Sequence, residues 1–109
     1  MKEPSFDNVS KYPEGFLNKK LSVTGYFQYG LEPLLYKDKA SVSVGLTSEA
    51  ILLQDKSVLN RLEKQCSGNL VEVFGVVTES YDRAKIVDID KVVLLDSGKI
   101  CWRSEWRGG

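Results

Sequence analysis

The residues that most often carry catalysis are scarce in this sequence. It contains no histidine, which removes the commonest general base and metal ligand, and neither Cys66 nor Cys101 has the imidazole partner that activates a nucleophilic thiol. Asp88 and Asp90 stand two residues apart, so on a strand both carboxylates face one side. A solvated strand face explains this pair more simply than a cation site. No glycine-rich phosphate-binding loop occurs either. We therefore expect a protein that is not an enzyme and that uses no metal and no cofactor.

The charge balance narrows the choice of partners. The chain has 15 lysine and arginine residues against 15 aspartate and glutamate residues, and its net charge is zero. Domains that mainly hold nucleic acid usually carry a basic surplus, so the balance disfavours that role but leaves a local basic patch open. The start Met-Lys-Glu-Pro lacks the apolar segment of a secretory signal, and no apolar run approaches the ~20 residues that span a bilayer. We expect a cytoplasmic protein that does not contact membranes.

The length and composition predict one globular domain. The chain has 109 residues, of which 42% are hydrophobic and 28% charged, as in an ordinary soluble domain. We therefore treat residues 1–109 as a single domain. Cys66 and Cys101 form no C-x-x-C pair, and we expect two reduced, half-buried thiols, with a disulfide between them left open. The sequence leaves the oligomeric state open as well.

Alternating apolar and polar residues predict a series of strands. The predicted strands cover residues 21–28, 34–36, 50–53, 70–78, 84–95 and, as a short last one, 100–102. One clear helix is predicted over 56–66, where Ser57 can cap the start and Gly68 ends it. The opening segment from Ser5 to Tyr12 predicts one or two helical turns. Residues 37–49 mix serine, glycine and charge without a clear pattern.

Two of the long alternating strands have a glycine in the middle, Gly25 and Gly75. Glycine weakens a strand interior, so it needs a structural reason there. A small five-stranded sheet has two exposed edges, and closing it into a barrel removes them. Tight closure requires sharp coiling of the longest strands, which glycine kinks and bulges supply. We therefore expect both glycines where strands bend round a barrel.

The strand order and local patterns resemble those of the OB-fold. The matching stretches are KLSVTGYF, PLLYKD, AILL, VLNRLEKQC, NLVEVFGVV and AKIVDIDKVVLL. They are also similar to small bacterial single-domain OB proteins, and the lead-in FDNVSKYPEGFLNKK adds to that similarity over roughly residues 5–95. The resemblance implies a mainly β fold: a five-stranded OB-like barrel over about 18–95. It also implies a helix between strands 3 and 4, a short helix before the barrel and a C-terminal extension over 96–109.

The resemblance also points to a binding surface, because OB-folds bind through strands two and three and the loops between strands one–two and four–five. On this chain the implied residues are Tyr26, Tyr29, Glu32, Tyr36, Lys37, Tyr81, Asp82 and Arg83. The tail WRSEWRGG adds Trp106 and Arg107, since tryptophan and arginine are frequent interface anchors.

Two classes of partner fit these residues. Tyrosines beside lysines stack bases and hold phosphates in proteins that bind single-stranded nucleic acid. Carboxylates such as Glu32 and Asp82 are interleaved here, however, and a mixed-charge surface with tyrosines suits a protein partner better. We expect a protein partner, and similarity to small bacterial OB proteins suggests an immunity protein that neutralises a toxin domain. A nucleic-acid-binding protein is the alternative.

Overall fold

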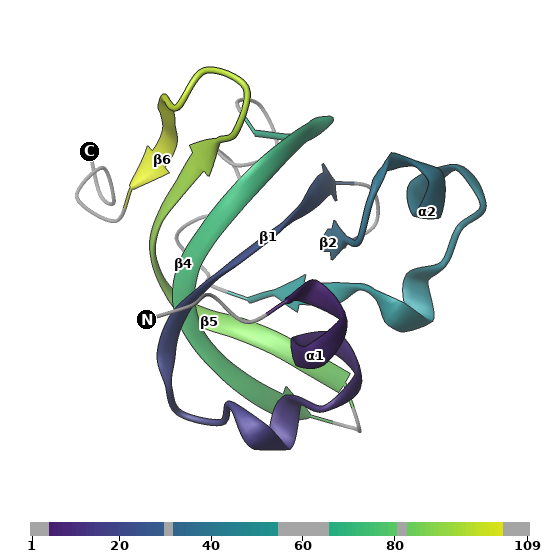
Figure 1. Ribbon diagram of the computed structural model, residues 1–109, viewed down its shortest axis with the longest axis vertical. Helices are drawn as coiled ribbons and strands as arrows, with labels where there is room; N and C mark the ends of the chain where they lie inside the picture. The colour runs from purple at the N-terminus through teal and green to yellow at the C-terminus, as the bar shows by residue number, and fades with distance from the viewer. Residues whose placement is uncertain (1–4, 30–31, 55–65, 81–82, 104–109) are drawn as a thin grey trace.

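The computed structural model describes residues 5–29, 32–54, 66–80 and 83–103. Figure 1 shows long curved strands wrapped around a common interior, with short helices on one side. The elements are α1 (Phe6–Lys11), a 3-10 turn η1 (Pro13–Gly15), β1 (Lys20–Tyr29), β2 (Pro33–Tyr36), α2 (Lys39–Ser43), a 3-10 turn η2 (Thr47–Glu49), β3 (Ile51–Leu53), β4 (Asn69–Ser80), β5 (Arg83–Leu94) and β6 (Ile100–Arg103).

The strands close into a barrel. Their order in the sheet is β3-β2-β1-β4-β5-β6, and β3 also pairs with β5 in parallel, with Leu52 opposite Lys85 and Leu53 opposite Ile86. That last pairing joins the two ends of the sheet, so β1 to β5 form a closed five-stranded mixed barrel that is compatible with an OB-like fold. The prediction of a mainly β barrel with a short N-terminal helix is confirmed.

The two mid-strand glycines lie where neighbouring backbone comes too close for a side chain. A Cβ built on Gly25 would lie 2.5 Å from the carbonyl oxygen of Tyr36, and one on Gly75 would lie 2.8 Å from that of Val87. Beside Gly75 the ladder is irregular, since Val76 pairs with Val87 while Phe74 pairs with Lys91. The close approach explains the glycine at both positions, and the irregular ladder at Gly75 agrees with the bulge that the sequence predicted there.

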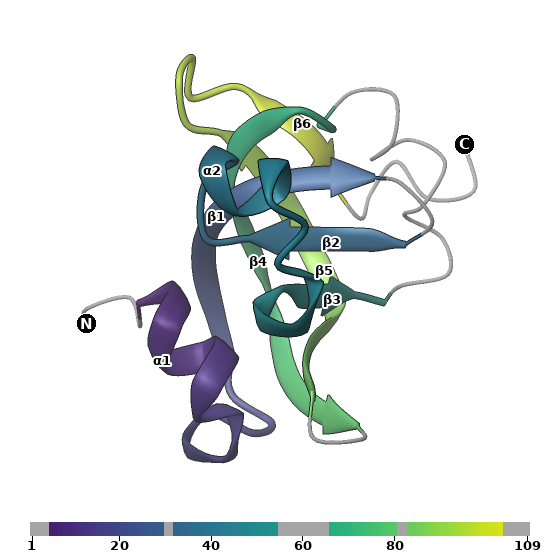
Figure 2. The same cartoon turned by 90° about the vertical axis from the view of Figure 1, so that its right-hand side faces the viewer.

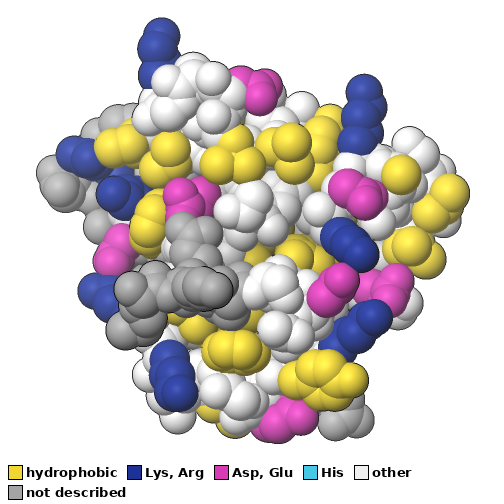
Figure 3. Space-filling model, in the orientation of Figure 1, with side chains coloured by type: hydrophobic (Ala, Val, Ile, Leu, Met, Phe, Trp, Pro, Cys, Tyr) yellow, Lys and Arg dark blue, Asp and Glu magenta, His cyan; other side chains and the backbone are white. Residues whose placement is uncertain are grey.

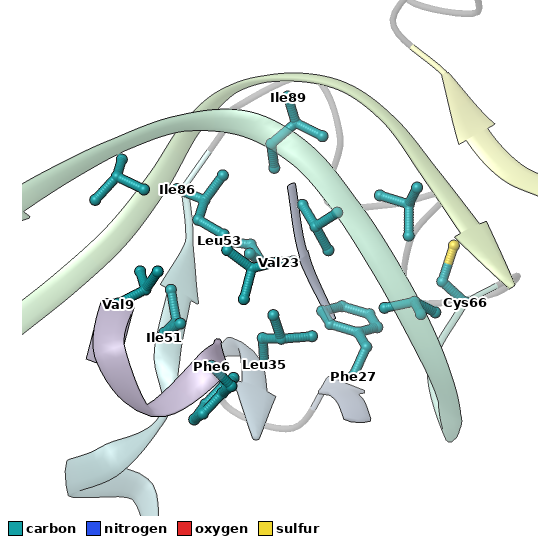
Figure 4. Close-up of a cluster of buried hydrophobic side chains, with 14 of the residues drawn as sticks. Phe6, Val9, Val23, Phe27, Leu35, Ile51, Leu53, Cys66, Ile86 and Ile89 are labelled. Carbon is teal, nitrogen blue, oxygen red and sulfur yellow. The ribbon is translucent and has the colours of Figure 1, made fainter. Parts of the chain in front are cut away.

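Apolar side chains of the strands fill the interior. Figure 4 shows residues from several strands pointing toward one another, with Phe6 and Val9 of α1 beside them. Val23, Phe27 and Ile86 are fully buried there, and Trp102 of β6 is also fully buried. The sixth strand therefore contributes to the same core as the barrel. The helix predicted over 56–66 falls almost entirely on residues 55–65, which lie outside the described residues.

The structure adds a short helix, α2, between β2 and β3, inside the segment that the sequence pattern left unassigned. Asp38 caps it: one carboxylate oxygen accepts hydrogen bonds from the backbone N–H of Ser41 at 2.8 Å and from its hydroxyl at 2.9 Å. Because the charged carboxylate accepts both bonds, the pKa of Asp38 is lowered. No helix in the described part of the chain has the length and apolar character to cross a bilayer.

The expectation of two reduced thiols is wrong. Cys66 and Cys101 form a disulfide, with 5.7 Å between their Cα atoms, and both residues are buried. The backbone N–H of Leu95 donates to the carbonyl of Leu70, which places the end of β5 beside the start of β4. The hairpin that follows then carries Cys101 back to Cys66. Thirty-five residues of sequence separation concealed this proximity.

Candidate functional site

Two of the predicted tyrosines, Tyr26 and Tyr36, lie on the outer face of β1 and β2, in a small cluster separate from the main core. Tyr26 and Tyr36 are directly opposite in the ladder, and Tyr36 is only 7% exposed. Leu34 and Ala50 are buried beside Tyr36, while Val42 of α2 packs against this cluster. The hydroxyl of Tyr26 donates to the carbonyl of Gly68 at 3.0 Å. Most of this face is therefore covered, and Tyr26 is the half-buried ring at its border.

Lys37, at the end of β2, is held by the first helix. Its ammonium lies 3.0 Å from the Asp7 carboxylate, and both side chains are substantially exposed. The hydrogen bond and charge of Asp7 raise the pKa of Lys37, and the nearby carboxylates of Asp38 and Glu49 add to that effect. This predicted cation therefore links α1 to β2.

Glu32 and Arg83, predicted as binding residues on two different loops, lie close to each other. One guanidinium nitrogen of Arg83 lies 3.8 Å from the Glu32 carboxylate, and another donates to the carbonyl of Thr47 at 2.8 Å. Tyr29 is half-buried and packs against the main core. The other predicted residues, Tyr81, Asp82, Trp106 and Arg107, lie outside the described residues.

A groove opens between α1 and the α2–η2 segment, with a volume of about 320 Å³. Figure 2 shows both helices on the same side of the barrel. The hydroxyl of Ser10 donates to the carbonyl of Glu49 at 2.6 Å and ties α1 to η2. The lining residues are Phe6, Asp7, Lys11, Lys37, Asp38, Ala40, Ser41, Val44, Leu46 and Glu49. We call this the helix groove.

The mouth of the helix groove combines exposed apolar and charged side chains. Val44 is 70% exposed and Leu46 is 40% exposed, although both are apolar. The right-hand side of Figure 3 shows apolar, basic and acidic side chains interleaved in this region. Of the predicted residues, Lys37 lines the groove. Sequence reasoning did not select Val44 and Leu46 as binding residues, because 37–49 gave no clear pattern, although the apolar residues in this polar segment were a usable signal.

A second apolar surface lies on the outer side of the sheet. Leu70 of β4 and Leu95, which follows β5, are 40% and 42% exposed, and they adjoin through the hydrogen bond between their backbones. Leu70 is also directly opposite Tyr26. The sequence carried a signal here as well: Val92 to Leu95 is an unbroken apolar run, so some of its side chains must face outward.

The carboxylates considered for a cation site are both exposed on β5. Asp90 lies 3.0 Å from the ammonium of Lys20, and Asp88 occupies the irregular part of the ladder with φ of 47°. Among the described residues, no group of three or more histidine, cysteine, aspartate or glutamate side chains is placed to hold a metal ion.

The sequence matches no protein-family model and no curated protein.

Proposed function

We propose that this protein is a non-enzymatic binding protein whose partner is another protein, and that it acts as an immunity protein which neutralises a toxin. The observation that carries the proposal is the helix groove of about 320 Å³, with Val44 70% exposed at its mouth. Protein interfaces concentrate their energy where an apolar or aromatic side chain of one partner fills such a hollow in the other. A polar and charged rim is the usual surrounding of that anchor.

The mixed charges around the groove do not select a partner of strongly acidic or strongly basic net charge. Lys11 and Lys37 line it together with Asp7, Asp38 and Glu49, and Lys37 is already paired with Asp7. The chain as a whole is neutral. Recognition therefore rests on shape and on local charge pairs, and long-range attraction contributes little to the rate of association.

The alternative, single-stranded nucleic acid, fits the same surface less well. Base stacking needs exposed aromatic rings beside available cations. Tyr36 is buried, Lys37 is paired with Asp7, and Arg83 is engaged by Glu32 and the Thr47 carbonyl. These contacts leave the described part of the predicted face poorly equipped to stack bases and hold phosphates.

In the proposed role the protein acts by occupying a surface. A loop or helix of the toxin inserts an apolar side chain between α1 and α2, against Phe6, Val44 and Leu46. The surrounding body of the barrel then covers the toxin's own working surface. The protein contributes no chemical step, so its effect depends on the affinity and lifetime of the complex.

Fluorescence anisotropy of labelled single-stranded DNA and RNA tests which class of partner the protein takes. We expect flat traces at low and at physiological salt. Affinity that is micromolar or tighter, falls with salt and weakens in Tyr26→Ala would instead establish the nucleic-acid alternative.

Co-expression with candidate toxins tests the immunity role directly, because a cognate toxin should lose its lethality.

A further inference from the structure

One wall of the helix groove, formed by residues 38–49, is both acidic and apolar. It contributes the carboxylates of Asp38 and Glu49, and the exposed side chains of Val44 and Leu46 stand on the same wall. Among the described residues that line the groove, this wall has no lysine or arginine. A cation that enters the groove from a partner therefore meets two carboxylates together with apolar surface.

Both carboxylates keep unused capacity to accept hydrogen bonds. Asp38 accepts its two bonds through one oxygen, and its second oxygen has none within the described part of the chain. Glu49 accepts from Ser10 through its backbone carbonyl, while its carboxylate has no ion pair or hydrogen bond among the described residues. Arg83 also reaches η2, but it is paired with Glu32 and does not line the groove.

The lysines of the groove do not neutralise this wall. Lys37 is engaged by Asp7 of α1 at 3.0 Å. Asp38 and Glu49 contribute to the raised pKa of Lys37, so several carboxylates surround a single ammonium. Lys11 belongs to α1, on the opposite wall. Over the whole groove three carboxylates stand against two ammonium groups, which leaves one negative charge in excess.

We propose that the partner places an arginine side chain against this wall. The guanidinium pairs with Asp38 and Glu49, because its planar fork matches the geometry of a carboxylate. The hydrocarbon stem of the arginine covers the apolar side chains beside them. The inference rests on the proposed function and deepens it, since it names the chemistry that a protein partner brings to the groove next to its apolar anchor.

Amide NMR titration of the full chain with three blocked dipeptides tests the proposal. The probes are acetyl-Leu-Arg-amide, acetyl-Leu-Gln-amide and acetyl-Leu-Glu-amide, which differ in charge and share the apolar side chain. We expect the arginine probe to bind in the millimolar range and to shift the amides of Ser41, Val44 and Glu49. Its affinity should exceed that of the glutamine probe by about two- to fivefold at low salt and fall as salt is added. The glutamate probe should bind most weakly.

Variants of the wall identify the groups that bind the arginine probe. Asp38→Asn, which keeps the cap of α2, and Glu49→Gln should each weaken its binding about two- to fivefold. Asp96→Asn is the matched control, because it removes an exposed carboxylate outside the groove and should change nothing. Lys11→Gln should strengthen binding of the arginine probe, since it removes a like charge from the opposite wall. A purely structural role of the two carboxylates would not produce that gain.

No binding of the arginine probe, equal binding of all three probes, or an affinity that neither wall variant lowers would overturn the proposal. No toxin enters this experiment, so it can fail while the immunity role still passes the co-expression test. Conversely, a failed rescue would leave an arginine site measured by the probes in place.

Discussion

At the scale of single residues, glycine is required at two positions inside β1 and β4 because neighbouring backbone leaves no room for a side chain. At Gly25 an added Cβ would meet both the Tyr36 carbonyl oxygen and the Leu35 side chain, at 2.5 and 2.8 Å. The carbonyl belongs to the β2 backbone, which cannot move without disturbing its pairing with β1. Gly15 provides a contrast, because nothing lies within 4 Å of the corresponding position.

Replacing Gly25 with alanine should lower the free energy of unfolding by about 2–3 kcal/mol, through overpacking against fixed backbone. Gly15→Ala, the matched control, should change it by less than about 0.5 kcal/mol. Urea denaturation of both variants beside the unchanged chain measures the difference. Equal effects of the two substitutions would contradict the role assigned to Gly25.

Stability should depend on pH through the contacts at the start of α2. The ionised form of Asp38 is favoured by its bonds from Ser41, so its pKa is lowered and its contribution is present at neutral pH. That contribution is lost as the pH falls through the folded-state pKa. Lys37 has a raised pKa, so its contribution is also present at neutral pH and is lost as the pH rises through that higher value.

Asp38→Asn separates these two effects. Asparagine is as good a helix cap as aspartate, so α2 should still begin at the same place. The loss of stability on the acid side should become shallower, while the alkaline side should change little, since Asp7 is the main cause of the Lys37 shift. Chemical denaturation across a pH series shows this directly. If the variant lost stability at low pH as steeply as the unchanged chain, Asp38 would not be a source of the pH dependence.

At the scale of elements, the disulfide joins β6 to the segment that leads into β4. β6 lies at the end of the sheet beside β5, and its pairing with β5 contains a register shift between Val92 and Val93. Trp102 on this strand is fully buried in the core. The covalent link therefore holds in place an edge strand that supplies a large core side chain.

Replacing both cysteines with serine should lower the free energy of unfolding by about 3–4 kcal/mol, the entropic value of closing a loop of this length. The sequence separation of 35 residues sets that figure. Hydrogen exchange should show β6 losing protection more than β1. The control is the unchanged chain with its disulfide reduced. Its stability toward thermal unfolding should fall to that of the double variant. A double variant as stable as the oxidised chain would show that the disulfide is not a stabilising element.

The strands were predictable because one physical rule governs them. Residues of β1 alternate between the core and the outside: Val23 and Phe27 are fully buried, whereas Thr24 and Tyr26 between them are only partly buried, so a period of two is visible in the sequence. The α2–η2 segment was not predictable from such a rule. It is short, its cap is a local bond between Asp38 and Ser41, and Val44 is exposed rather than buried. Helix α2 has only five residues and none of them is buried, so its sequence shows no repeating pattern of apolar residues.

At the scale of the whole molecule, closure of the barrel decided which predicted site residues came together. The parallel pairing of β3 with β5 places Arg83, at the start of β5, within 3.8 Å of Glu32, which precedes β2. The same closure, with α2 packed outside it, buried Tyr36, which the sequence had placed on an open face. The exposed apolar pair Leu70 and Leu95 comes from two different segments, and such a surface has no local signature beyond a run such as Val92 to Leu95.

The disulfide also bears on the expected cytoplasmic location, which stays a prediction. Disulfides persist mainly in oxidising compartments, because the cytosol keeps thiols reduced. Trapping free thiols in intact cells would report the state of Cys66 and Cys101 where the protein works.

The claim that the protein neutralises a toxin through the helix groove is tested most directly by co-expression in growing cells. A toxin encoded beside this gene is induced together with the unchanged chain, Val44→Lys or Leu70→Lys. The account predicts that the unchanged chain and Leu70→Lys restore growth, while Val44→Lys, which places a charge at the mouth of the groove, does not. Failure to rescue from any neighbouring toxin, or full rescue by Val44→Lys, would contradict it.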